Sequence, residues 1–427
     1  MCDGTLVRQL QNEVQLLRKH IESLENRLKA YENAHTPPSR SYKRRPLKPE
    51  DERKSPGRKP GHEGTTRPYR EPDKTIPVTQ DTCTHCNATL GEPRSFESRI
   101  IEDIPRPQQA TITRFLVARY LCERCGRETV ATHPDLPASG LFGKNLLSLA
   151  AAMKYKYRLP YRKITHALKA QHGIDITPAA VVAMVGRTAV SLRDGYSGIG
   201  KRIMNAAVVH ADETSIRVDG KKWWIWIFVA GDDVLVVVAD SRGEGVIKSV
   251  LGPDFTGIVV CDGWKPYKAF TSNLQRCWAH LLREADGLAE KGTEGRALAH
   301  ALHEMFDRAT DVLEANPPPQ ERRRLWRRMR RWMGIWLNKP SPEAQVQKFI
   351  NKVRNGYDHW FTFVLHPGVE PTNNTAERAL RESVVQRKII GCLRNQKGTF
   401  AHETMMSVFA TWENQGLNIY DEMGKYL

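Results

Sequence analysis

The chain has 427 residues, of which 40% are hydrophobic, and it carries 65 lysines and arginines against 48 aspartates and glutamates, a formal net charge of +17 at pH 7. This length allows several domains with real cores. No apolar run approaches the roughly 20 residues that span a bilayer, and the polar N-terminus is not a secretory signal, so we expect a cytoplasmic protein with no membrane partner. A basic surplus of this size favours nucleic acid as the partner, although a merely soluble basic protein or a membrane-surface binder would share it.

Residues 5–32 form a heptad repeat. Its core positions are Val7, Val14, Ile21 and Leu28 at a, and Leu10, Leu17, Leu24 and Tyr31 at d. β-Branched residues at a with leucine at d favour a parallel dimer. We therefore predict a coiled-coil dimerisation helix over residues 1–35, giving a homodimer or a higher oligomer. The alternative is an amphipathic helix that packs on its own protein.

Residues 36–75 are predicted to be a basic, disordered linker. Proline, lysine and arginine dominate this stretch, and such a composition cannot bury a core. Arg58 and Lys59, within Gly57-Arg58-Lys59-Pro60-Gly61-His62, are candidates for entering a DNA minor groove. A solvated linker with general phosphate affinity is the alternative.

Two C-x-x-C pairs predict a zinc ribbon over residues 76–135. Each pair can present two thiolates to one tetrahedral ion, and the strand-like segment from Ala110 to Leu121 lies between them. The four expected zinc ligands are Cys83, Cys86, Cys122 and Cys125. Four sulfur ligands leave no open position, so this Zn²⁺ would be structural.

Residues 141–196 follow a helical pattern that resembles a helix-turn-helix. One helix is expected from Leu146 to Tyr157 and a second from Pro160 to about Gln171. Thr177 can cap a third helix that has Pro178 at its first position. In the functional interpretation this last helix enters the DNA major groove. It is short of positive charge, so a packing role is the alternative.

Residues 206–262 contain apolar segments of strand length separated by turns. Asp219-Gly220 predicts a tight hairpin turn. Three antiparallel strands, a helix and a fourth strand are the opening order of a ribonuclease-H-like fold. If the fourth strand lies beside the first, Asp212 and Asp262 meet at the strand ends, and a divalent cation is the usual remedy for their repulsion. The alternative is that each aspartate is only a turn former.

The remainder is mostly helical and contains a basic run at 321–332, whose arginines either contact phosphates or solvate an outer face. Cys277 and His280 stand three residues apart and share a helical face. They are either functional neighbours of the site or simply a buried cysteine beside a histidine whose hydrogen bonds are satisfied. Glu377 either forms a capping box with Asn374 or is a third metal-site carboxylate. In the second case four basic residues would line the approach of a phosphate backbone: Arg378, Arg381, Arg387 and Lys388.

These motifs resemble the insertion-sequence-66 family of bacterial DDE transposases over nearly the full length of the chain. The most specific segment is Thr372-Asn373-Asn374-Thr375-Ala376-Glu377-Arg378. The resemblance implies that Asp212, Asp262 and Glu377 are the catalytic triad. It also implies that Cys277 and His280, in a C-x-x-H signature, are active-site neighbours. The separation 377 − 262 = 115 implies a helical insertion at about residues 283–365.

The expected fold class is therefore multidomain α+β, with the coiled coil, zinc ribbon and helix-turn-helix-like domain preceding a ribonuclease-H-like catalytic domain over residues 203–427. The resemblance implies an enzyme that binds the terminal inverted repeats of its element, nicks the ends by metal-dependent hydrolysis and joins the 3′ ends to target DNA. Its cofactors would be two catalytic Mg²⁺ ions, with Mn²⁺ as a substitute, and structural Zn²⁺. Double-stranded DNA and accessory proteins of the element would be its partners, in a bacterial cytoplasm at the nucleoid. The alternatives are a non-catalytic DNA-binding regulator and a structure-selective nuclease of the same fold.

Overall fold

The computed structural model describes residues 13–15, 17, 18, 20–24, 70–137 and 139–427. The chain divides into two compact units, Met1–Gln108 and Gln109–Leu427. Arg58 and Lys59, with most of the heptad repeat and the basic linker, lie outside the described residues. Within the part that is described, every helix is too short or too polar to cross a membrane.

In the first unit, the described residues between 13 and 24 are helical and exposed. Four of the predicted heptad core residues are among them, with exposed fractions of 44–56%: Val14, Leu17, Ile21 and Leu24. An apolar stripe that is uncovered in a single chain agrees with the predicted dimerisation helix, which stays a prediction. Residues 70–108 are mostly irregular and exposed.

The second unit begins with a short antiparallel hairpin, β1 (Arg119–Leu121) and β2 (Glu128–Val130). The strand predicted from Ala110 to Leu121 is therefore realised only over its last three residues. Pairing ends at Arg119↔Val130, followed by one further hydrogen bond from the Ala131 N–H to the Ala118 carbonyl at 2.9 Å. The earlier residues have no partner strand in the described structure, so their β propensity is not realised.

Four helices follow: α2 (Lys144–Tyr155), α3 (Tyr161–His172), α4 (Pro178–Ser191) and α5 (Arg193–Met204). The predicted start of α4 is confirmed, since Thr177 Oγ1 accepts a hydrogen bond from the Ala180 N–H at 3.2 Å and Pro178 is the first helical residue. Helix α4 packs against α2, α3 and α14 and buries Val181, Met184 and Val185. These contacts account for the apolar face of α4.

The centre of the second unit is a five-stranded mixed sheet in the order β5-β4-β3-β6-β7. Its strands are β3 (Val208–Val218), β4 (Lys221–Ala230), β5 (Asp233–Ala239), β6 (Ile258–Cys261) and β7 (Leu274–Arg276), with α6 (Glu244–Leu251) and α7 (Lys265–Phe270) between them. The predicted tight turn is confirmed, because Asp219 and Gly220 have φ angles of 49° and 72°. The fourth predicted strand does lie beside the first, in parallel, with Val208 paired to Ile258 and His210 to Val260.

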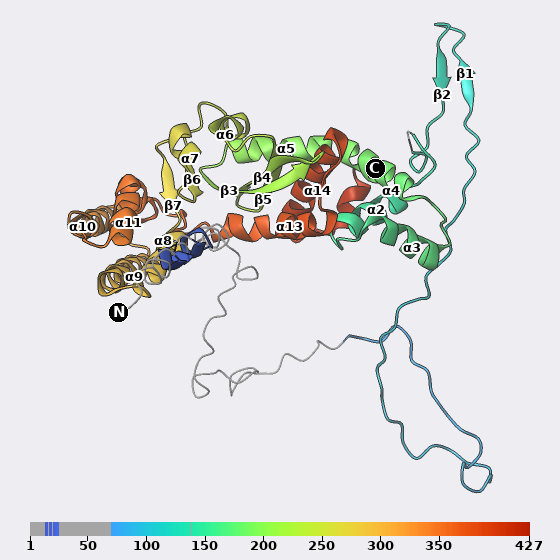
Figure 1. The fold of residues 1–427 in the computed structure, drawn as a ribbon. Helices are drawn as coiled ribbons and strands as arrows, with labels where there is room; N and C mark the ends of the chain where they lie inside the picture. Colours follow the sequence, from blue (N-terminus) through green and yellow to red (C-terminus); the bar gives the residue numbers. More distant parts are fainter. Residues whose placement is uncertain (1–12, 16, 19, 25–69, 138) are drawn as a thin grey trace. The chain divides into compact units, whose positions relative to one another are not determined.

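Helices cover both faces and one edge of this sheet (Figure 1). Helix α5 packs on β4 and β5, whereas α13 (Asn374–Ile390) packs on β3 and β4 from the opposite side. Helix α14 (Gln396–Asn414) lies along the edge strand β5, and α15 (Ile419–Gly424) ends the chain. The apolar residues of α2, α4, α5, α14 and the sheet form one continuous core.

Between β7 and α13 in the chain lies a helical segment, as predicted for about residues 283–365. It comprises α8 (Trp278–Ala289), α9 (Thr293–Glu314), α10 (Pro319–Leu337), α11 (Ala344–Asn355), the 3₁₀ turn η3 (Tyr357–His359) and α12 (Thr362–Leu365). These helices bury their own apolar core, in which Trp278, Met305 and Met329 are at most 1% exposed. The segment begins immediately after β7 and returns to the sheet at α13.

Candidate active site

The parallel pairing of β3 and β6 brings Asp212 and Asp262 to neighbouring positions. The last paired residues are His210 and Val260, and each aspartate stands two residues further along its strand direction. Neighbouring strands in a sheet lie about 5 Å apart. Asp212 Oδ1 accepts the Glu213 N–H at 2.8 Å, and Asp262 Oδ1 accepts the Trp264 N–H at 2.7 Å. Among the described residues, neither Oδ2 atom accepts a hydrogen bond, so both remain available for a ligand.

The carboxylate of Asp212 is in an unfavourable electrostatic environment. Burial raises its pKa well above the usual value, and the negative charges of Glu213, Asp262 and Glu377 raise it further, against a smaller opposing effect of the Glu213 N–H. Asp262 and Glu377 therefore each lie close enough to Asp212 for their negative charges to disfavour its ionised form. A bound cation would relieve this repulsion.

The start of α13 is held by Asn373, which is fully buried. Its side-chain Nδ2 donates to the Ala211 carbonyl at 2.8 Å, next to Asp212, and its backbone N–H donates to Cys277 Sγ at 3.1 Å. The helix begins at Asn374 and has no side-chain cap, so the capping box of Asn374 with Glu377 is not formed. Glu377 is therefore not occupied as a helix cap. The sequence motif around Asn373 is specific, but the motif does not predict the contacts of Asn373 with Ala211 and Cys277.

Cys277 and His280, predicted as active-site neighbours, contact Glu377. Ligand atoms of these three residues all lie within 4.8 Å of one another. His280 Nδ1 is 3.5 Å from Glu377 Oε1, which is beyond ordinary hydrogen-bond length. The buried Cys277 and the partly buried His280 thus form one wall of the carboxylate site.

Glu213 is a fourth carboxylate that sequence reasoning did not single out. It is 8% exposed and, by strand alternation, lies on the opposite face of β3 from Asp212. Its Oε1 accepts a hydrogen bond from Arg242 at 2.8 Å and its Oε2 accepts one from the Tyr267 hydroxyl at 2.6 Å. Burial, followed by the charge of Asp262, raises its pKa despite these contacts. The adjacent Asp212-Glu213 pair in the sequence was the signal that could have revealed it.

The guanidinium of Arg242, which is hydrogen-bonded to the buried Glu213, connects this carboxylate to the turn that follows Asp262. It lies over the Trp264 ring at 4.0 Å and the Trp224 ring at 4.7 Å. Trp264 Nε1 donates to the Arg242 carbonyl at 3.2 Å. Since the Trp264 N–H also binds Asp262, this stack fixes the turn that carries the second aspartate.

Arg276 is a second buried cation near Asp262 that the sequence did not reveal. It is 8% exposed and lies over the Trp360 ring at 4.6 Å. A Cβ atom on Gly263 would lie 2.0 Å from its Nη2, so the guanidinium occupies space that any other residue at position 263 would take from it. Burial lowers the pKa of Arg276, whereas the nearby Cys261 and Asp262 raise it.

The predicted phosphate-binding residues of α13 fall into two groups. Arg378, Arg381 and Lys388 are exposed and accessible to a ligand. Arg387 is different, because its guanidinium donates to Thr214 Oγ1 at 2.9 Å and to the Ser215 carbonyl. Arg387 thus ties α13 to β3, two residues beyond Asp212.

Both predicted zinc-binding pairs form tight turns, one in each unit. The Asn87 N–H donates to the Cys83 carbonyl at 2.9 Å, and the Gly126 N–H donates to the Cys122 carbonyl at 2.8 Å. Asn87 and Gly126 have φ angles of 59° and 66°. Backbone N–H groups hydrogen-bonded to the sulfur lower the pKa of Cys83 and of Cys122. Each turn is therefore suited to presenting a thiolate.

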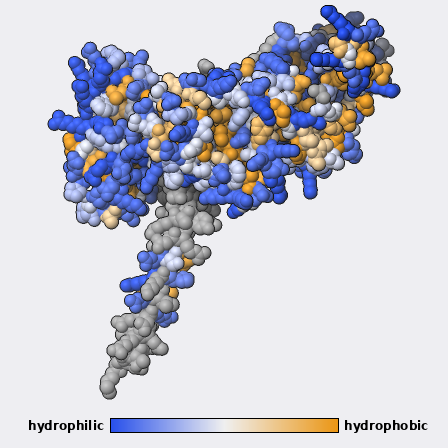
Figure 2. Space-filling model, turned by 90° about the horizontal axis from the view of Figure 1, so that it is seen from above, coloured by the Kyte–Doolittle hydropathy of each residue, from blue (hydrophilic) through white to orange (hydrophobic). Residues whose placement is uncertain are grey.

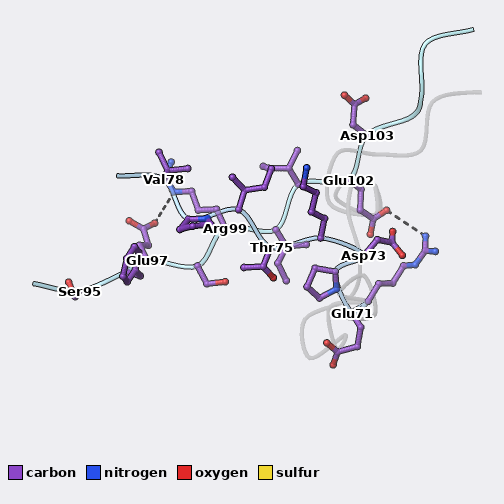
Figure 3. A pocket seen from close by; sticks show the side chains of 18 residues that line it. Glu71, Asp73, Thr75, Val78, Ser95, Glu97, Arg99, Glu102 and Asp103 are labelled. Atoms are coloured by element: carbon purple, nitrogen blue, oxygen red, sulfur yellow. Dashed lines mark hydrogen bonds and ion pairs between the residues drawn. The ribbon is translucent and has the colours of Figure 1, made fainter. Parts of the chain in front are cut away.

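The first unit also has an open hollow between residues 70–78 and 95–103 (Figure 3). Its lining residues are exposed, and charged groups around it pair with each other: Arg99 with Glu97 at 2.9 Å and Arg70 with Glu102 at 3.8 Å. Among the described residues, the group of side chains that could hold a metal ion is Cys277, His280 and Glu377, and none of these three lines the hollow.

Carboxylates clustered on neighbouring strands of a mixed sheet, in a strongly basic chain, are typical of enzymes that process nucleic acids with metal ions. Residues 139–401, which include Asp212, Asp262 and Glu377, match the family model described as Transposase IS66 family, and the chain belongs to this family. A curated relative, the uncharacterized protein y4hP of Sinorhizobium fredii (strain NBRC 101917 / NGR234), is 24% identical over 405 residues, covering 84% of this chain and 71% of the relative. Family membership implies a DNA-binding, DNA-processing enzyme.

Proposed function

We propose that this protein is a DDE transposase, in which Asp212, Asp262 and Glu377 of a ribonuclease-H-like core nick the ends of an insertion sequence and join them to target DNA. The observation that carries the proposal is the pairing of β3 with β6 in parallel, beneath the N-terminal turn of α13. This arrangement collects three carboxylates that are 50 and 115 residues apart in the chain (262 − 212 and 377 − 262). The raised pKa of Asp212, caused by burial and by the other carboxylates, supports their convergence.

The donor set fits Mg²⁺, which prefers oxygen ligands and one or two carboxylates per ion. Asp212 and Asp262 would each offer Oδ2, and Glu377 would complete the set. When bound, Mg²⁺, or Mn²⁺ in its place, supplies Lewis acidity and lowers the pKa of water. The chain itself holds the carboxylates in place, with Asn373 fixing the start of α13 and Trp264 fixing the turn after Asp262.

The basic surface of α13 would position the DNA strand to be cut. Arg381 and Lys388 lie four and eleven residues beyond Glu377, so all three share one face of the helix. Arg378 is on the adjacent face, and these three basic side chains are exposed. Phosphate contacts of this kind orient a duplex without reading its sequence.

Helix α10 offers a second surface for phosphates. Seven arginines lie between residues 322 and 331. Two have structural contacts: Arg322 donates to the Pro317 carbonyl at 3.2 Å, and Arg330 pairs with Asp358 at 2.8 Å. The other five are exposed and form no ion pair with any described residue: Arg323, Arg324, Arg327, Arg328 and Arg331. In Figure 2, hydrophilic residues predominate over this helical end of the second unit, and we assign the arginine face to DNA outside the cut site.

The two C-x-x-C turns and the N-terminal heptads would serve assembly. Their geometry supports thiolate ligation, and one Zn²⁺ shared by Cys83, Cys86, Cys122 and Cys125 would join the two halves of a ribbon. The exposed stripe from Val14 to Leu24 supports a coiled-coil dimer that brings two element ends together.

The test is a cleavage and joining assay on duplexes that carry the terminal repeats of the element, with Mg²⁺. Wild-type protein should nick at the repeat end and join the 3′ end to a target duplex. Asp212→Asn, Asp262→Asn and Glu377→Gln should bind the repeat with wild-type affinity and form no joined product. Binding without metal-dependent nicking by the wild type would instead identify a regulator, and nicking without joining would identify a nuclease.

A further inference from the structure

A second group of metal-ligand atoms lies beside the carboxylate site. Cys277 Sγ, a ring nitrogen of His280 and a carboxylate oxygen of Glu377 lie within 4.8 Å of one another. Sulfur, imidazole and carboxylate together are the ligands of Zn²⁺ and similar ions, whereas Mg²⁺ takes oxygen. This cluster is therefore chemically distinct from the two aspartates.

The separation of His280 from Glu377 suits one shared ion. In a tetrahedral zinc site, ligand atoms that are each 2.0–2.3 Å from the metal are about 3.3–3.7 Å apart. His280 Nδ1 and Glu377 Oε1 are 3.5 Å apart, within that range and too far for a good hydrogen bond. Glu377 Oε1 is buried and accepts no hydrogen bond from any described residue. This oxygen is positioned as a ligand rather than as a hydrogen-bond acceptor.

The backbone N–H groups that follow Cys277 act on its sulfur as those that follow Cys83 and Cys122 do. At Cys83 and Cys122, N–H groups two and three residues further on are directed at the sulfur. At Cys277, which stands at the N-cap position of α8, the N–H groups of Ala279 and His280 lower the pKa of the thiol in the same way, and the Asn373 N–H donates a hydrogen bond to Sγ at 3.1 Å. Hydrogen bonds to sulfur stabilise a thiolate, the form that binds metal, although burial has the larger effect here and raises the pKa of Cys277. Cys277 Sγ thus accepts a hydrogen bond from the segment that precedes Glu377, and His280 lies three residues further on along the same face of α8.

We propose that Cys277, His280 and Glu377 form a Zn²⁺ site with one open position, separate from the structural zinc of the ribbon. The site shares Glu377 with the proposed catalytic centre, although its existence does not depend on the transposase chemistry. Zn²⁺ bound here would occupy Glu377 Oε1, and this oxygen would then no longer be available to Mg²⁺. Zn²⁺ would then act as an inhibitor of the enzyme.

The test counts metal on the full-length chain without DNA. Each protein is loaded with Zn²⁺, dialysed against metal-free buffer, and measured by inductively coupled plasma mass spectrometry. Wild type should retain one more Zn²⁺ per chain than Cys277→Ser, His280→Asn and Glu377→Gln. Cys392→Ser, which removes a partly buried cysteine outside the cluster, and Asp212→Asn should match wild type.

A wild-type zinc content equal to that of all three cluster variants would overturn the proposal, as would an equal loss in Asp212→Asn, which would place the ion among the aspartates. Glu377→Gln is nearly isosteric and leaves the buried Cys277 unchanged, so it keeps the test valid if Cys277→Ser fails to fold. Because the assay involves no strand transfer, a change in metal count and a loss of joining activity are independent outcomes.

Discussion

Asn373 connects three parts of the site that are far apart in the chain. Its side chain binds the Ala211 carbonyl on β3, its backbone binds Cys277 at the start of α8, and it immediately precedes α13. A buried amide with these contacts restricts where Glu377 can lie relative to Asp212. Residues that orient metal ligands in this way typically contribute 10–100-fold to metal affinity or activity.

We therefore expect Asn373→Ala to lower strand transfer by roughly 10–100-fold and to destabilise the fold by about 1–3 kcal/mol, because the Ala211 carbonyl loses its partner. The measurements are joining rate, with Mg²⁺ concentration varied, and chemical denaturation. Asn374→Ala is the matched control, since Asn374 is exposed and provides no helix cap. A destabilised Asn373→Ala protein that joins DNA at the wild-type rate would reduce Asn373 to a purely structural residue.

Asp212→Asn should lower strand-transfer activity and raise the stability of the fold. The folded-state pKa of Asp212 is raised, so its contribution to stability is fully present below pH 3.8 and is lost as the pH rises through the folded value. Without metal at pH 8, the variant should melt at a higher temperature than wild type, while strand transfer falls by roughly 10⁴-fold. Mg²⁺ should raise the melting temperature of wild type more than that of the variant. Equal responses to Mg²⁺ would argue against a cation at Asp212.

At the scale of elements, side chains of the helix α14 accept the hydrogen bonds that a further strand would accept from the edge strand β5. Three outward N–H groups of β5 are satisfied by side chains of α14: Val234 by Thr411 at 3.0 Å, Val236 by Ser407 at 2.8 Å, and Val238 by Glu403 at 2.5 Å. Four helical residues rise about 6.0 Å and two strand residues about 6.6 Å, so the two spacings nearly match. This polar row covers an edge that would otherwise pair with another chain.

The glutamate in this row should make stability depend on pH. Burial raises the pKa of Glu403 to about 7, against 4.5 for an ordinary glutamate, although the Val238 N–H lowers it. Because the folded pKa is the higher one, this stabilisation is present below pH 4.5 and is lost as the pH rises to about 7. The loss amounts to about 3 kcal/mol (2.5 × 1.36).

Glu403→Gln keeps an acceptor for the Val238 N–H and should remove this pH dependence. The measurement is the free energy of unfolding from urea denaturation at pH 5 and pH 8 for both proteins. Glu244→Gln on α6 is the control, because Glu244 is exposed and its charge should matter little. If wild type and Glu403→Gln lose the same stability between the two pH values, the glutamate is not the responsible group.

At the scale of the whole molecule, the basic residues behind the net charge of +17 have two kinds of environment, internal and exposed. Some basic side chains are internal: Arg242 binds Glu213, Arg276 lies beside the Asp262 turn, and Arg387 holds α13 to β3. Other basic side chains are exposed, among them five arginines of α10. The apolar face of this helix packs in the helical core through Leu325, Met329 and Met333. One helix thus supplies core packing on one side and a row of arginines on the other.

Replacing Arg324, Arg327 and Arg331 by glutamine should weaken DNA binding at physiological salt and reduce the slope of log K against log salt by up to about 2.7, which is 0.9 for each phosphate that is no longer neutralised. The measurement is fluorescence anisotropy with a terminal-repeat duplex over a range of salt concentrations. The charge-matched control is Arg217, Lys221 and Lys222 to glutamine at the exposed β3–β4 turn. An equal change in both triple variants would mean that net charge, and not the α10 surface, governs binding.

Local patterns in the sequence were enough for much of the fold, and with the family resemblance they were enough to propose the site residues. The Asp219-Gly220 turn, the Thr177-Pro178 helix start, the strands around Asp212 and the helical segment after β7 all depend on short-range backbone preferences and apolar periodicity. Asp212, Asp262 and Glu377 could also be named in advance, because carboxylates at strand ends and within a specific motif are visible in one dimension. The order of these elements left the pairing of the fourth strand with the first as a condition, which the parallel β3–β6 pairing fulfils.

Only the tertiary structure decided how the site is supported. The environment of a buried polar group depends on residues that are distant in sequence, so nothing near Asn373 predicts Ala211 and Cys277 as its partners. The same holds for the Glu213–Arg242–Tyr267 contacts, for the space that Gly263 leaves to Arg276, and for Arg387, whose charge suggested DNA but whose hydrogen bonds join α13 to β3. Burial and long-range packing assigned these roles, because a charged side chain taken out of water must find its partner wherever the fold has placed one.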